Sequence, residues 1–244
     1  MSTLQAPNTK VVSPAGSPQG ATNVEAFIFD MDGTMIDSMG HHAESWMLFA
    51  KQHGLNVDVA DLMRRTTGRT GAECMCELFE RDLAPEEAWA LIAEKEQLYR
   101  DAFGPVFAEV AGFKAFYAQA LARGLKAGVG TAGDKHNIAF AMKHLALATP
   151  PHAVVGGDEG FPGKPDPAIF LEVASRMNTR ASDSIVFEDA PFGIEAARRA
   201  GMQAVAICTT HTPAELAGPH VIAAARDYHE LLNSNFLETF HVAT

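Results

Sequence analysis

Short apolar runs alternate with amphipathic segments along most of this chain. The runs at 24–29, 125–130, 153–155, 184–187, 204–208 and 221–224 are typical of buried strands. The segments at 113–122, 138–145, 167–177 and 191–200 have helical spacing, and Gly124 and Gly201 stand where the first and last should end. Alternating strands and helices predict an α/β fold in which a parallel sheet carries helices on both faces.

The stretch from 39 to 104 breaks this alternation because it has helical patterns and no strand pattern. Apolar side chains recur at helical spacing between 46 and 53, and Gly54 follows as the expected end of that helix. Pro85 fits the first turn of another helix, in which Trp89, Ile92 and Tyr99 are expected to share one face. We predict an α-helical cap domain at 39–104, inserted into a core formed by 24–38 and 105–244.

Composition and charge narrow the classes of partner. The chain is 47% hydrophobic and 20% charged, which suits a buried core, and its net charge is −11. Because an acidic surface repels phosphate backbones and anionic lipids, we expect neither nucleic-acid binding nor membrane docking. Three cysteines are too few for a disulfide scaffold, so we expect a reduced, cytoplasmic protein. Residues 1–23 have no apolar run and are predicted to be a disordered leader.

The first candidate site follows the first predicted strand, at Asp30-Met31-Asp32-Gly33-Thr34. Residues two apart on extended backbone face the same way, so Asp30 and Asp32 are expected to converge. Two neighbouring carboxylates need a cation or a shared proton. Taken alone, the segment is equally consistent with a turn in which aspartates cap the backbone.

Two further segments carry groups that suit an anion. Thr131 and Ala132 follow a predicted strand and offer a hydroxyl and free backbone N–H groups, although Thr131 alone could be an ordinary helix N-cap. Lys164 lies between Gly163 and Pro165, where constrained backbone can aim one ammonium group. A solvated loop lysine is the plain alternative.

Glu188 and Asp189 end another predicted strand. With Asp30 and Asp32 they place four carboxylates at the edge where the carboxyl ends of parallel strands meet. Hard oxygen ligands in this number suit Mg²⁺, which also accepts phosphate oxygens. The combination is much more specific than any of its parts.

These segments, in this order, resemble the motifs of the haloacid-dehalogenase superfamily of phosphohydrolases. Further similarity lies in the runs 163–167 and 187–197, which resemble the subfamily that contains β-phosphoglucomutase and many sugar-phosphate phosphatases. The resemblance spans about 24–210 and implies a Rossmann-like core with an inserted helical cap. The motifs are specific for the superfamily and only weakly specific for the substrate.

The resemblance implies a role for each motif residue. Asp30 would attack phosphorus to form an aspartyl-phosphate, and Asp32 would act as general acid and then as general base. Mg²⁺ would be held by Asp30, the Asp32 carbonyl and Asp189. Glu188 would bind the metal through water or orient its ligands. The resemblance also implies that Thr131, Ala132 and Lys164 contact the phosphoryl oxygens.

Two cap residues are weaker candidates. Arg69 lies in a small-residue turn where relatives carry a basic residue that reaches the substrate, and a solvated arginine is the alternative. His42 lies ten residues after Asp32, where relatives place a hinge or acid-positioning histidine; a surface histidine, or a role for His41, is the alternative. A phosphonatase would need a poised cap lysine, and neither Lys51 nor Lys95 has a recognisable setting.

The sequence therefore predicts a Mg²⁺-dependent phosphatase that hydrolyses small phosphate monoesters, sugar phosphates above all. An acid two residues after the nucleophile separates it from dehalogenases, whose halide leaves without protonation. A phosphosugar mutase of the β-phosphoglucomutase type is the alternative within the same chemistry, and a non-catalytic binding module is the alternative from another class. The expected partner is a small phosphorylated metabolite, bound by a monomer or weak dimer.

Overall fold

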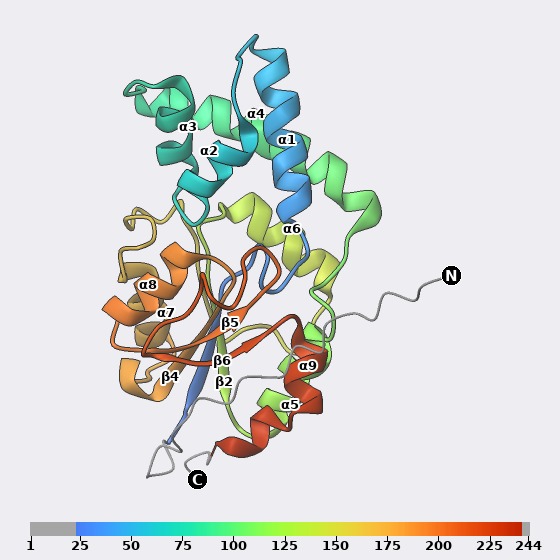
Figure 1. Ribbon diagram of the computed structural model, residues 1–244, viewed down its shortest axis with the longest axis vertical. Coiled ribbons are helices and arrows are strands. Elements are labelled where there is room, and N and C mark those ends of the chain that lie inside the picture. Colours follow the sequence, from blue (N-terminus) through green and yellow to red (C-terminus); the bar gives the residue numbers. More distant parts are fainter. Residues whose placement is uncertain (1–22, 241–244) are drawn as a thin grey trace.

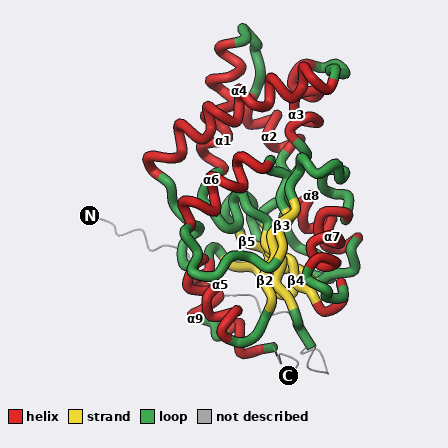
Figure 2. Tube along the Cα trace, turned by 180° about the vertical axis from the view of Figure 1, so that it is seen from behind, coloured by secondary structure: helices red, strands yellow, loops and turns green. Residues whose placement is uncertain are grey.

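A computed structural model describes residues 23–240 of the chain. Nearly all of the leader predicted for 1–23 lies outside the described residues. Figure 1 shows a parallel sheet below a group of helices, and Figure 2 shows the same layers from behind. Within the described range, the strands form a six-stranded parallel sheet in the order β3-β2-β1-β4-β5-β6.

Each strand coincides with one of the predicted apolar runs. Their bounds are β1 Ala26–Phe29, β2 Lys126–Gly130, β3 Ala153–Val155, β4 Ser184–Glu188, β5 Gln203–Ile207 and β6 Val221–Ala225. The central strand β1 is buried throughout because helices cover both faces. Its side chains alternate: Phe27 and Phe29 join one apolar cluster, and Ala26 and Ile28 join the other.

Helices pack on both sides of this sheet, as the alternation of elements predicts. One cluster includes side chains of α5 (Phe113–Ala122), α6 (Lys135–Leu145) and α9 (Tyr228–Asn233). The opposite cluster includes side chains of α7 (Ala168–Arg176) and α8 (Pro191–Arg199). Short 3-10 turns at Gly104–Val106, Ala181–Asp183 and Phe236–Thr239 complete this layer. The prediction of a Rossmann-like α/β fold is confirmed.

The helices inserted after β1 have an apolar core of their own. They are α1 (Met39–Gln52), α2 (Val59–Thr66), α3 (Gly71–Phe79) and α4 (Pro85–Phe103). Trp46, Phe49, Leu62 and Ile92 are among the side chains of this third cluster. We propose that α1 to α4 form a cap domain over the sheet. None of the helices in the described part of the chain is long and apolar enough to cross a membrane.

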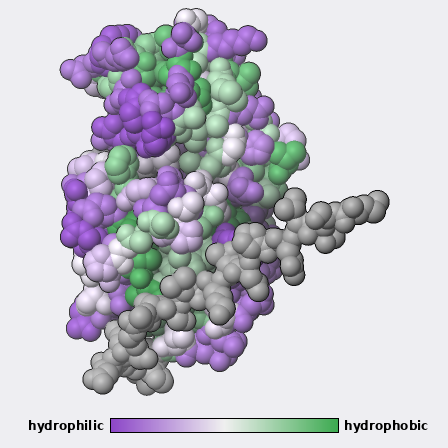
Figure 3. All heavy atoms as spheres, viewed as in Figure 1, coloured by the Kyte–Doolittle hydropathy of each residue, from purple (hydrophilic) through white to green (hydrophobic). Residues whose placement is uncertain are grey.

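One predicted apolar position in the cap is wrong. Trp89 was expected to share one face of α4 with Ile92 and Tyr99, but it is 49% exposed whereas those two are buried. The buried face passes instead through Ala88, Ile92 and Lys95 to Tyr99, because steps of three and four residues keep these side chains on one line. Figure 3 shows hydrophilic residues over much of the cap on the face turned to the viewer.

Candidate active site

The candidate site lies where β1 and β4 end side by side. Phe29 and Phe187 are register partners, and the Asp30 N–H donates to the Phe187 carbonyl at 3.0 Å. Asp30 therefore leaves β1 next to Glu188 and Asp189 of β4. The carboxylate oxygens of these three residues lie within 4.8 Å of one another, and all three residues are buried. The sheet thus brings together side chains that are more than 150 positions apart in the chain.

Lys164 is the buried partner of this cluster. Its side chain has no exposed surface, and its Nζ lies 2.5 Å from Asp30 Oδ1 and 2.8 Å from Glu188 Oε1. Burial alone would lower the pKa of Lys164, but Asp30 and Glu188 outweigh it and raise that pKa above its ordinary value. The plain alternative for Lys164, a solvated loop lysine, is wrong.

The cluster carries more negative than positive charge. Burial raises the pKa of Asp30 to about 7, partly offset by Lys164, and burial together with Glu188 raises the pKa of Asp189 well above its ordinary value. Three carboxylates face one ammonium, so the buried site lacks about two positive charges when all three are ionised. A divalent cation with a preference for hard oxygen ligands fits this set, and the cluster can therefore hold a metal.

The oxygens of the cluster are not equally free. Glu188 Oε1 accepts from Lys164, and Oε2 accepts from the Ala190 N–H at 2.7 Å. Asp189 Oδ2 accepts from the Thr210 hydroxyl at 2.6 Å, and its Oδ1 lies 3.4 Å from the Thr34 hydroxyl. Each of these two carboxylates thus has a protein donor on both oxygens, and the contact to Asp189 Oδ1 is the longest of the four.

Gly33 allows the backbone to turn directly beneath Asp189. Its φ of +78° lies in the left-handed region, and a Cβ at this position would overlap the Asp189 carboxylate. The glycine in the predicted motif is therefore required both by its own conformation and by the close approach of the β4 carboxylate.

Asp32 turns away from this cluster toward the cap. Its Oδ1 accepts from the Ser38 hydroxyl at 2.7 Å, lies 3.0 Å from His42 Nε2 and 3.3 Å from the Tyr99 hydroxyl. Burial would raise the pKa of Asp32, but His42, Ser38 and Lys95 together lower it below the ordinary carboxyl value. Asp30 and Asp32 therefore line one cavity in opposite electrostatic settings, and Asp32 is not part of the cluster of Asp30, Glu188 and Asp189. A metal contact through the Asp32 carbonyl stays a prediction.

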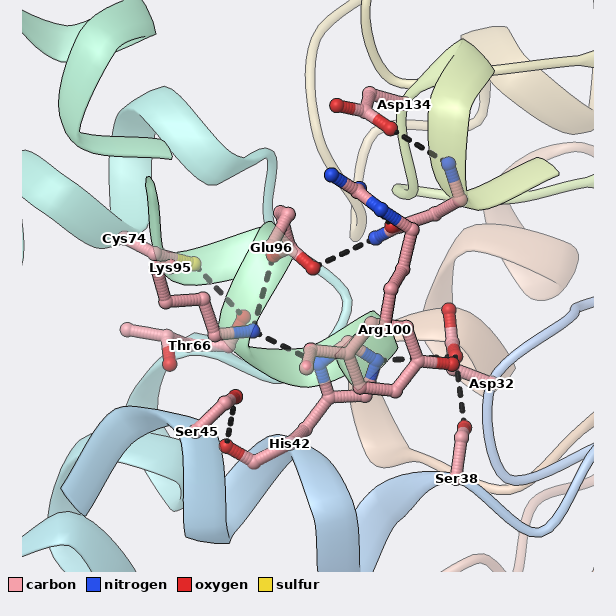
Figure 4. Close-up of polar contacts among 12 residues, drawn as sticks. Asp32, Ser38, His42, Ser45, Thr66, Cys74, Lys95, Glu96, Arg100 and Asp134 are labelled. Atoms are coloured by element: carbon pink, nitrogen blue, oxygen red, sulfur yellow. Dashed lines mark hydrogen bonds and ion pairs between the residues drawn. The ribbon is translucent and has the colours of Figure 1, made fainter. Parts of the chain in front are cut away.

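His42 lies between Asp32 and Lys95 (Figure 4). Lys95 Nζ lies 2.8 Å from His42 Nδ1 and 2.9 Å from Glu96 Oε1. A lysine ammonium only donates, so Nδ1 must accept, and the ring proton stands on Nε2 and points at Asp32. The ring also stacks on Tyr99, with centroids 3.8 Å apart. His42 rather than His41 is thus the histidine that contacts Asp32.

Thr131 and Ala132 line the same small cavity of about 120 Å³ as Asp30, Asp32 and Asp189. The Thr131 oxygen accepts from the Gly133 N–H at 3.0 Å, which leaves its O–H proton available to a ligand. The alternative that Thr131 is the N-cap of the next helix is wrong. Asp134 takes that position in α6, because its side chain accepts from the Asn137 N–H.

Arg69 lines the cavity from the cap, in the turn between α2 and α3. Its Nη1 forms an ion pair with Glu77 Oε2 at 3.3 Å, and its side chain is 34% exposed. The turn reaches the core through the Gly68 carbonyl, which accepts from the Lys164 N–H at 3.2 Å. Arg69 therefore lies near the site with its charge already paired.

Sequence reasoning missed the lysine that holds His42. Lys95 was set aside for lack of a recognisable setting, yet it is 2% exposed and lines the cavity. Its position three residues after Ile92 and four before Tyr99, on the buried face of α4, is the signal that could have identified it. Tyr99 was expected only to share a helix face with Trp89 and Ile92, whereas its hydroxyl contacts Asp32.

Comparison with known proteins places this arrangement in a family. The model of the family described as haloacid dehalogenase-like hydrolase matches residues 27–207, well over half of the chain. The chain belongs to this family. The predicted resemblance is thus confirmed, and the match includes every motif that carried it.

Two curated haloacid dehalogenase-like hydrolases illustrate the similarity. Validoxylamine A 7'-phosphate phosphatase of Streptomyces hygroscopicus subsp. limoneus is 32% identical over 195 residues, which cover 80% of this chain and 91% of that protein. Fructose-1-phosphate phosphatase of Escherichia coli (strain K12) is 34% identical over 184 residues, covering 73% of this chain and 93% of that protein.

A solved structure shares the fold of this haloacid dehalogenase-like hydrolase. The β-phosphoglucomutase of Clostridium difficile superposes with a TM-score of 0.76 at 23% identity, covering 88% of this chain and 96% of that chain.

Proposed function

We propose that this hydrolase is a Mg²⁺-dependent phosphatase that cleaves small phosphate monoesters, sugar phosphates above all, through an aspartyl-phosphate on Asp30. One observation carries the proposal. A buried cluster of three carboxylates and one lysine lies beside Asp32. His42 of the cap contacts the Asp32 carboxylate. Phosphate-ester hydrolysis needs both a nucleophile and a separate proton donor, and this site supplies them two residues apart.

In the first step an Asp30 oxygen attacks phosphorus opposite the ester oxygen. The phosphorus–ester bond breaks, and protonated Asp32 gives its proton to the leaving alkoxide. In the second step Asp32 takes a proton from water, the water oxygen attacks phosphorus, and the bond to Asp30 breaks. Inorganic phosphate leaves, and both carboxyl groups return to their starting states.

The other residues hold the phosphoryl group during transfer. Lys164 Nζ, the Thr131 hydroxyl and the Ala132 N–H donate to its oxygens, where charge shifts in the transition state. Mg²⁺, held by Asp30, Asp189 and the Asp32 carbonyl, would supply further neutralisation of charge between nucleophile and phosphoryl oxygens. Glu188 keeps Lys164 in place from the opposite side.

The relatives support a phosphorylated sugar or sugar-like metabolite as substrate. One is a validoxylamine A 7'-phosphate phosphatase and the other a fructose-1-phosphate phosphatase, and each shares at least 32% of the aligned residues with this chain. The site itself recognises the phosphoryl group, whereas the cap contacts the remainder of the ester. The leaving alcohol is therefore selected by the cap.

Hydrolysis fits better than a mutase reaction because of the cations in the cap. A mutase must hold a second phosphate near the cap while the intermediate reorients, and this requires free basic groups. Arg69 is paired with Glu77, and Lys95 is engaged by Glu96 and His42. Water, rather than a second sugar hydroxyl, is then the acceptor of the phosphoryl group.

The test replaces the nucleophile by an amide. Asp30→Asn should abolish Mg²⁺-dependent phosphate release from p-nitrophenyl phosphate and from sugar phosphates, because an amide is no nucleophile. Asp37→Asn, an exposed aspartate of the same segment, is the matched control and should keep wild-type turnover. Turnover by Asp30→Asn within tenfold of wild type, without deamidation by mass spectrometry, would contradict the covalent route.

The same enzyme distinguishes hydrolysis from isomerisation. β-Glucose 1-phosphate with a trace of the 1,6-bisphosphate should yield free phosphate, or no reaction, and little glucose 6-phosphate. Rapid formation of glucose 6-phosphate without phosphate release would establish the mutase instead.

A further inference from the structure

A second, larger cavity adjoins the reaction cavity between cap and core. Its volume is about 410 Å³, against about 120 Å³ for the cavity that contains the aspartates. The two cavities share wall residues, among them Gly71, Glu96, Ala132 and Asn137. We call the larger cavity the outer chamber. Sites for small organic ligands usually measure about 300–1,000 Å³, so only the outer chamber reaches that size.

The outer chamber has an aromatic wall and acidic groups. Trp89 and Ile92 of α4 line it from the cap, and Phe161 lines it from the loop after β3. Trp89 is 49% exposed, which is unusual for the largest apolar side chain, and an indole face suits the C–H face of a sugar ring. The exposure of Trp89, which sets it apart from the buried Ile92 and Tyr99, is thus explained by its place on this wall.

The charges of the outer chamber all have one sign. Among the described residues that line it, none is Lys, Arg or His, whereas Glu73, Glu96, Asp134 and Asp158 are acidic. Glu96 is balanced by Lys95. Glu73 caps the first turn of α3 through Thr70.

Glu73, Asp134 and Asp158 contribute acidic charge that no cation among the described lining residues balances. Asp134 occupies the N-cap of α6, and Asp158 lies in the loop after β3. The neighbouring Arg100 donates to Asn137 and Gln97 instead. A second phosphate entering here would meet three carboxylates and no cation among the described lining residues.

We infer that the outer chamber selects the leaving group: the substrates are monophosphates of extended, non-anionic polyols, and bisphosphates are rejected. This inference rests on the proposed phosphatase function and adds the class of alcohol released. The phosphoryl group occupies the reaction cavity, and the remainder of the ester extends through the shared wall against Trp89. Asp134 and Asp158 discriminate against a second anionic group by repulsion.

The charge arm of the test compares fructose 1-phosphate with fructose 1,6-bisphosphate. Wild type should have the higher kcat/KM for the monophosphate, and Asp134→Asn with Asp158→Asn should raise the bisphosphate-to-monophosphate ratio about tenfold. Asparagine keeps the N-cap of α6. Asp227→Asn, the N-cap of α9 outside the outer chamber, is the matched control and should leave the ratio unchanged. An unchanged ratio in the double variant, or a wild type that prefers the bisphosphate, would overturn the inference.

The shape arm compares trehalose 6-phosphate with p-nitrophenyl phosphate. Trp89→Ala should lower the ratio of their kcat/KM values about fivefold. Met47→Ala, which removes another exposed apolar side chain of the cap, should leave it unchanged. An equal ratio in Trp89→Ala and wild type would contradict the role of Trp89. Absence of Mg²⁺-dependent phosphate release from p-nitrophenyl phosphate in the wild type would instead overturn the proposed function itself.

Discussion

Asp30 and Asp32 show how two identical side chains, two positions apart, acquire different chemistry. Burial raises the pKa of Asp30 despite Lys164, whereas His42 and Ser38 outweigh burial and lower the pKa of Asp32. In the metal-free site these directions are the reverse of those that the proposed roles require, because the nucleophile Asp30 must be ionised and the general acid Asp32 protonated. The contact with His42 also fixes which Asp32 oxygen is occupied, because Oδ1 receives the donors from Ser38, His42 and Tyr99.

The role of Asp32 can be separated from that of Asp30 by the leaving group. Asp32→Asn should lower kcat/KM for an alkyl phosphate about 10²–10⁴-fold, because an alkoxide leaves poorly without a proton. The loss for p-nitrophenyl phosphate should be below tenfold, since its leaving group needs little protonation and kcat/KM reports the first transfer only. Steady-state kinetics with both esters measures the difference. Equal losses for the two esters would argue against a general acid at this position.

The pairing of α1 with α4 links two helices of the cap to the catalytic acid. His42 comes from α1 and Lys95 and Tyr99 from α4, and the two helices pack along much of their length. Lys95 is enclosed by Trp46 and Tyr99, whose rings lie 4.8 Å and 5.7 Å from its Nζ. A change in the packing of these helices would therefore alter the contacts of Asp32.

A double-mutant cycle tests this connection. Lys95→Met and His42→Gln should each lower kcat/KM for an alkyl phosphate by at least about tenfold, but by less than Asp32→Asn. The double variant should be about as slow as the slower single variant, because both changes act through the same contact to Asp32. Lys51→Met, the exposed lysine of the cap, serves as the control and should match wild type. Fully additive losses would indicate that the two residues act independently.

In the folded protein, buried carboxyl groups outnumber buried ammonium groups at the centre of the sheet. Asp30 and Asp189 are buried at the junction of the two apolar clusters, and their folded-state pKa values lie above the ordinary carboxyl value. Between about pH 3.8 and 7, Asp30 therefore binds more protons in the metal-free folded protein than in the unfolded chain. This protonation contributes to the free energy of unfolding, and the contribution is lost as pH rises through this window. A cation bound to the ionised cluster offsets the loss.

The stabilisation by Mg²⁺ should consequently depend on pH. At 100 times its Kd, Mg²⁺ contributes about 2.7 kcal/mol, which for a chain of this size corresponds to a Tm rise of roughly 5–11 °C. The rise relative to EDTA should be larger at pH 7.5 than at pH 5.5, because protons compete for the same oxygens at low pH. Differential scanning fluorimetry at both pH values measures it. Asp189→Asn should reduce the rise, and a rise that is equal at both pH values in wild type would contradict the assignment.

The sequence by itself determined the order of strands and helices along the chain and the strand ends that carry Asp30, Thr131, Glu188 and Asp189. These features follow from local pattern, because buried strands read as apolar runs and their polar ends must lie at the edge of a parallel sheet. The strand ends could therefore be placed together before any side chain was located.

Only the tertiary structure decided what the cap contributes. The environments of Lys95, Arg69 and Trp89 depend on how α1 to α4 pack and on which faces meet the core. A helical pattern alone does not decide these contacts, because the buried face can shift by one or two residues. In the structure Lys95 is only 2% exposed, Arg69 forms an ion pair with Glu77, and Trp89 is exposed in the outer chamber. Periodicity fixes the position of a side chain around its own helix axis, whereas its partners are fixed by the packing between elements distant in sequence.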